Sequence, residues 1–163
     1  MRRLCGGVLG HLPIPVTREK VSGSVMAIKV ERVAQRWSFR LPRFHEQRGN
    51  ANKILGRILN HLDQGTDIQI VSVNGGSKDN VIAGSSEAVI MAKDLEKAKA
   101  IVNGMEADIK SEFSSDEPNF QVPVSVAEGT EHALSKEATR KVIFAMVGTP
   151  YGARDSTVIC RVL

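Results

Sequence analysis

Residues 45–55 read His45-Glu46-Gln47-Arg48-Gly49-Asn50-Ala51-Asn52-Lys53-Ile54-Leu55, and they open the most regular part of the chain. From residue 51 onward the apolar residues recur three or four positions apart: Ala51, Ile54, Leu55, Ile58, Leu59 and Leu62. Residues with this spacing share one face of an α-helix. Asn50 or Asn52 can cap the start of the helix, and Gly65 can end it. The stretch therefore predicts an amphipathic helix that packs one face against a core.

The segments beside this helix have the composition of β-strands. β-Branched and other apolar residues are frequent in residues 21–30, 67–73 and 87–93, which favours strands at all three places. The sequence Asn74-Gly75-Gly76 ends the second of these segments and predicts a break in the strand.

A fourth strand is indicated by alternation. Phe120, Val122, Val124 and Val126 alternate with other residue types, as in a strand with one buried face. Pro123 lies between two of them and has no backbone N–H to give to a neighbouring strand. We therefore expect either an edge strand or a position at which no ladder donor is needed.

Two more helices complete the expected order. Asp94 can cap a helix that reaches Ile109, and a third helix is predicted over residues 135–146. The order is then strand, helix, strand, strand, helix, strand, helix. The first six elements match a split β-α-β pattern, so we predict an α+β fold of the ferredoxin-like sandwich type. It has a four-stranded antiparallel sheet with helices on one face, plus a C-terminal helix.

Length and composition restrict the class of protein. The chain has 163 residues, of which 42% are hydrophobic and 25% charged, as in one globular domain. Pro13 and Pro15 interrupt the only candidate signal-peptide core, and no apolar run approaches the roughly 20 residues of a membrane span. Cys5 and Cys160 imply neither a disulfide framework nor a metal knuckle. We expect a cytoplasmic location and no membrane partner.

The histidines do not have the pattern of a metal or catalytic site. The chain has four of them, His11, His45, His61 and His132, and none belongs to a His-x-Asp pair. A two-metal site needs several His, Asp and Glu residues that converge, commonly with a bridging carboxylate. We therefore expect no metal ligands and no catalytic residues in this chain, and we expect the histidines to be solvated or to lie at helix ends.

A set of short motifs resembles one peptidase family. Gly49 to Lys53 match its Gly-Asn-Ala-Asn-Lys helix opening, His45 matches the histidine that precedes it, and residues 74–76 match its Asn-Gly-Gly. Asn80-Val81-Ile82 is similar to its Asn-Ala-Ile-Pro, with Ala83 in place of the proline. The match covers residues 21–30 and 45–151. The chain thus resembles the lid (dimerisation) domain of the aminoacyl-histidine dipeptidases, also called Xaa-His or cytosolic non-specific dipeptidases.

The resemblance implies a role within a larger enzyme. Members of this family are two-zinc hydrolases of dipeptides, in which a metal-activated water attacks and a glutamate acts as general base. Those groups belong to a catalytic domain that we do not find in this chain. The resemblance implies a homodimer formed through the lid, and in the intact dimer it places Asn80 at the substrate. It assigns residues 1–20 to an irregular lead-in, 21–128 to the lid and 129–163 to an additional helix and tail.

Residues 31–44 depart from the family. Where the family has Gly-Gly-His-Ser-Gly, this chain has Arg36-Trp37-Ser38-Phe39-Arg40. The codons TGG-TCA-TTC-CGG encode Trp-Ser-Phe-Arg, and one nucleotide later they read Gly-His-Ser-Gly. We therefore expect this segment to be a local frameshift of family sequence and to lack regular structure. The histidine that the lid would offer to a partner's active site is lost with it.

Two other functions remain open from the sequence. One is a free-standing module that dimerises through a sheet edge or a helix face. The other is a small basic nucleic-acid-binding protein, because residues 1–50 carry ten Lys and Arg against three Asp and Glu, within a net charge of +4. We attribute the basic character to the frameshift and expect no nucleic-acid partner.

Overall fold

The computed structural model describes residues 16–31, 50–76, 83–113 and 119–148. The atypical segment 31–44 is outside this part of the chain except for Glu31, so the structure does not test its expected lack of order. The elements are, in chain order, β1 (Arg18–Val30), α1 (Ala51–Gly65), β2 (Ile68–Gly75), β3 (Ser86–Ala92), α2 (Leu95–Glu112), β4 (Val124–Leu134) and α3 (Lys136–Gly148). This order confirms the predicted alternation of strands and helices.

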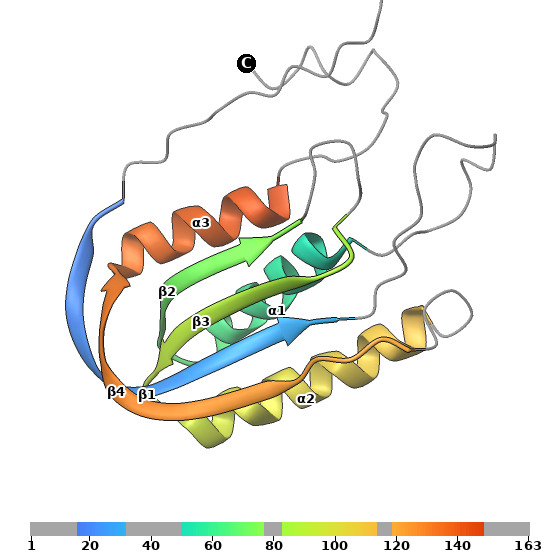
Figure 1. Cartoon of the computed structure of the whole chain (residues 1–163), viewed down its shortest axis with the longest axis horizontal. Helices are drawn as coiled ribbons and strands as arrows, with labels where there is room; N and C mark the ends of the chain where they lie inside the picture. Colours follow the sequence, from blue (N-terminus) through green and yellow to red (C-terminus); the bar gives the residue numbers. More distant parts are fainter. Residues whose placement is uncertain (1–15, 32–49, 77–82, 114–118, 149–163) are drawn as a thin grey trace, which may run out of the picture.

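The four strands form one antiparallel sheet in the order β2-β3-β1-β4. The helices cover one face of the sheet, with α1 between α2 and α3 (Figure 1). The sheet and the helices bury a common core, in which Ile28, Ile58, Ile90 and Ile109 are fully shielded from solvent. The predicted ferredoxin-like α+β class is therefore confirmed. Among the described residues, no helix is both long enough and apolar enough to cross a membrane.

Helix α1 forms where the apolar spacing predicted it. All six of the apolar residues that define the spacing are buried: Ala51, Ile54, Leu55, Ile58, Leu59 and Leu62. The side chain of Asn50 caps the helix, since its Oδ1 accepts hydrogen bonds from the backbone N–H groups of Asn52 and Lys53. The periodic residues bury the helix on the sheet, and the cap satisfies the donors of its first turn.

The pairing of β1 with β4 is longer than the sequence indicated. It runs from Arg18 opposite Leu134 to Ile28 opposite Val124, whereas we expected the first strand to begin at residue 21. The outer half of this two-stranded ribbon carries mostly exposed, polar residues, so it lacks the apolar alternation that reveals a strand. Residue 128, at which we ended the lid segment, lies inside β4.

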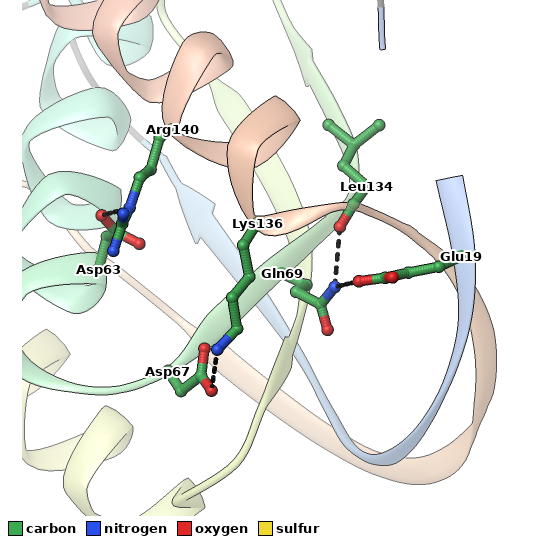
Figure 2. Close-up of polar contacts among 7 residues, drawn as sticks. All are labelled: Glu19, Asp63, Asp67, Gln69, Leu134, Lys136 and Arg140. Atoms are coloured by element: carbon green, nitrogen blue, oxygen red, sulfur yellow. Dashed lines mark hydrogen bonds and ion pairs between the residues drawn. The ribbon is translucent and has the colours of Figure 1, made fainter. Parts of the chain in front are cut away.

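Helix α3 is held against the rest of the fold by two ion pairs. Arg140 Nε lies 3.3 Å from Asp63 Oδ2 near the end of α1, and Lys136 Nζ lies 2.7 Å from Asp67 Oδ2 before β2 (Figure 2). Both pairs reach the solvent, so each contributes at most about 1 kcal/mol. Most of the attachment must come from the buried side of α3, which includes Ile143.

The outer edge of β2 is closed by side chains. Thr139 of α3 is fully buried, and its Oγ1 accepts the backbone N–H of Ile70 at 3.1 Å. Gln69 Nε2 donates to the carbonyl of Leu134 at 3.1 Å and also to Glu19, so the far end of the β1–β4 ribbon reaches β2 (Figure 2). These contacts occupy backbone groups of β2 that an edge strand would otherwise expose.

Candidate functional site

The family motifs converge at one end of the sheet. Ala51, the first residue of α1, donates its backbone N–H to the carbonyl of Ala83 at 2.9 Å. Gly76 donates its backbone N–H to the carbonyl of Ser85 at 3.3 Å. The start of α1, the end of β2 and the start of β3 therefore meet, although they are separated in the sequence.

Gly75 is the point of closest approach in this cluster. A Cβ atom at this position would lie 1.9 Å from Asn52 Oδ1 and 2.4 Å from Ser86 Oγ. Ser86 is buried, and its hydroxyl donates to the carbonyl of Asn74 at 3.1 Å. Only a residue without a side chain fits between Asn52 and Ser86, so the first glycine of the pair is explained by packing.

Gly76 has a different reason to be glycine. Its φ is +83°, in the left-handed region that side chains with a Cβ disfavour. The sequence predicted a break at Asn74-Gly75-Gly76, and the structure shows that the strand ends at Gly75. The packing role of Asn52 was missed, because capping by Asn50 or by Asn52 fits the sequence equally well.

Asn80, the one predicted substrate-contacting residue, lies outside the described residues. The chain enters the intervening segment at Gly76 and leaves it at Ala83, and the hydrogen bonds above hold both residues at the meeting point of α1, β2 and β3. His11 and His45 also lie outside the described part, whereas His61 and His132 are solvent-exposed, as expected.

The described residues do not fit a metal site. Within them, no three His, Cys, Asp or Glu side chains are grouped so that they could hold an ion. The clearest charge pairing is bidentate, between the Arg57 guanidinium on α1 and the Glu112 carboxylate on α2, at 2.8 and 2.7 Å. Hydrogen bonding to Arg57 lowers the pKa of Glu112 below its usual value. Because both side chains are exposed, we assign the pair to helix packing and not to catalysis.

Residues 43–117 match the family model described as a peptidase dimerisation domain. The chain carries a peptidase dimerisation domain. The cytosol non-specific dipeptidase of Escherichia coli (strain K12) is 29% identical over 117 residues, which is 70% of this chain and 24% of that protein. The dimerisation domain thus corresponds to a family of dipeptidases, as its motifs predicted.

A solved structure supports the same fold. The crystal structure of aminoacylhistidine dipeptidase from Vibrio alginolyticus superimposes with a TM-score of 0.76 and 21% identity. The superposition covers 85% of this chain and 29% of that one. The dimerisation domain therefore spans less than a third of the length of either relative.

Proposed function

We propose that this chain is the lid domain through which a dipeptide-hydrolysing metallopeptidase forms a homodimer. The observation that carries the proposal is the match of residues 43–117 to the dimerisation-domain model. The same fold in the Vibrio dipeptidase supports it. In the parent protein zinc would be held outside the residues described here, and the cytosolic relative supports a cytoplasmic location.

Self-association of the whole chain tests this proposal. Sedimentation velocity over a wide range of protein concentration is expected to show a monomer that converts to a dimer as the concentration rises. The bacterial dipeptidases named above may need their catalytic domains for stability, so the concentration series should extend to the highest soluble level. A chain that stays monomeric throughout would contradict the dimerising role.

The chain by itself is expected to have no dipeptidase activity. The motivation is the absence, in the sequence, of the His, Asp and Glu set that a two-metal site requires. The purified chain should be incubated with Zn²⁺, Co²⁺ or Mn²⁺ and a histidine-containing dipeptide. Turnover clearly above the metal-only blank would show that a catalytic site exists within these residues.

Asn80 is the residue that we assign to the substrate in the intact dimeric parent. The support is its match to the family's Asn-Ala-Ile-Pro motif and the fixed ends of its segment at Gly76 and Ala83. In this account Asn80 acts on a dipeptide only when a catalytic domain is present.

A further inference from the structure

The register of β1 and β4 determines which backbone groups of β4 face outward. The Glu31 and Gln121 backbones exchange both hydrogen bonds, and Lys29 donates its N–H to the carbonyl of Pro123 at 3.1 Å. In an antiparallel pair, hydrogen-bonded positions alternate with positions whose N–H and C=O groups point away from the partner. The odd-numbered residues of β4 therefore bond to β1, and the even-numbered residues present their backbone groups at the free edge.

The residue before β4 agrees with this alternation. Val122 has an even number, and its backbone N–H donates to Glu106 Oε1 of α2 at 3.3 Å and not to β1. The next even positions are Val124, Val126 and Glu128, for whose N–H groups the described residues provide no acceptor at the outer edge. Val126 is one of the few large apolar side chains that remain exposed, at 41%.

The opposite edge of the sheet is not available in the same way. Ile70 N–H is bound by Thr139, and Arg18 Nη1 donates to the carbonyl of Val71 at 3.0 Å. An unpaired edge that carries neither charge nor proline is a template for another strand. Among the described residues, the stretch from Val124 to Ala127 at the β4 edge has this character.

We propose that a second copy of this chain pairs with the β4 edge, antiparallel, with Val126 opposite Val126 of the second copy. The proposal rests on the proposed dimerising function and specifies its contact surface. The two sheets would then continue into one another, and the two exposed Val126 side chains would meet at the two-fold axis. The occupant is a second copy because the matched family model describes a dimerisation domain.

Charge selects this register from its neighbours. A two-fold axis at Glu128 would place two carboxylates directly opposite each other, which destabilises a strand pair. With the axis at Val126, Glu128 lies opposite Val124 of the second copy. The two Glu128 positions are then four residues apart along the strand, roughly 13 Å, which exceeds the screening length of about 8 Å at physiological salt.

A proline at the outer edge tests the surface. Val126→Pro removes an N–H that points away from β1, so the β1–β4 ladder stays intact while pairing with a second copy is blocked. Val126→Thr keeps the N–H and is the matched control. In sedimentation velocity we expect the proline variant to dissociate at least tenfold more readily than the threonine variant, with unchanged far-UV circular dichroism.

A cysteine scan tests the register. Residues opposite each other at a hydrogen-bonded antiparallel position have Cα atoms about 5.5 Å apart, which a disulfide can span. In a Cys5→Ser, Cys160→Ser background, Val126→Cys should form a covalent dimer on mild oxidation. Ser125→Cys should not, because Ser125 lies opposite Ala127 of the second copy.

The outcomes separate this proposal from the function on which it rests. A dimer that survives Val126→Pro but is lost in Phe144→Ser would place the contact on α3, where Phe144 is 79% exposed. That result would overturn the β4 contact and leave the dimerising function standing. A wild-type chain that is monomeric at every concentration would instead overturn the function. Equal crosslinking of the two cysteine variants would overturn the register.

Discussion

Phe120→Ala is expected to lower the free energy of unfolding by about 3–5 kcal/mol, the usual loss for a buried aromatic residue. Phe120 is only 2% exposed and packs in the common core just before β4. Its removal leaves a cavity at the point where the chain passes from α2 to the edge strand. Chemical denaturation monitored by circular dichroism measures the change.

The chain provides a matched control for that substitution. Phe144 on α3 is 79% exposed, so Phe144→Ala removes the same atoms from a position that is largely in water. We expect a change in stability within about 0.5 kcal/mol for this variant. Equal losses for the two alanine variants would mean that Phe120 does not belong to the core.

Gly75→Ala is expected to cost about 1–3 kcal/mol, the usual penalty for inserting a carbon into a packed site. The new Cβ would overlap Asn52 Oδ1 and would also lie 2.9 Å from Ser86 Cβ. The Asn52 side chain can rotate away, but the Cβ of Ser86 is fixed to the backbone of β3. Part of the cost should therefore remain when Asn52→Ala is added.

Gly104→Ala is the control for Gly75→Ala. A Cβ at Gly104, within α2, would meet no atom within 4 Å, and alanine is favoured over glycine inside a helix by about 1 kcal/mol. Thermal and chemical unfolding should therefore show that one glycine-to-alanine change stabilises the chain and the other destabilises it. A neutral Gly75→Ala would show that the close approach of α1, β2 and β3 is not as the structure has it.

The elements that the sequence predicted well are those whose burial is periodic. Ala51 to Leu62 face the sheet at helical spacing, and nothing else in the fold competes for that face. Asn50 could be proposed as a cap because capping depends on residues close in the sequence. The alternation around Val124 likewise indicated the edge strand, which the sheet order confirms.

The features that the sequence did not predict depend on contacts between distant segments. The outer half of β4 is polar because it pairs with β1 in contact with solvent, so no apolar pattern marks it. Thr139 interrupts an otherwise apolar helix face, and only the structure shows that its hydroxyl satisfies Ile70. The contact of Asn52 with Gly75 joins positions 23 residues apart. The role of Asn80 stays a prediction, because its segment lies outside the described residues.

Sequencing the gene and its flanks is the most direct test that this chain is a lid from a dipeptidase gene. We predict that Ser38 is encoded by TCA and Phe39 by TTC, so that a shift of one nucleotide restores Gly-His-Ser-Gly. We also predict metal-ligand sequence of the peptidase type upstream and the remainder of the lid and catalytic domain downstream. An AGC or AGT codon for Ser38, together with flanks that encode no peptidase-like sequence, would contradict the account and favour a free-standing dimerising module.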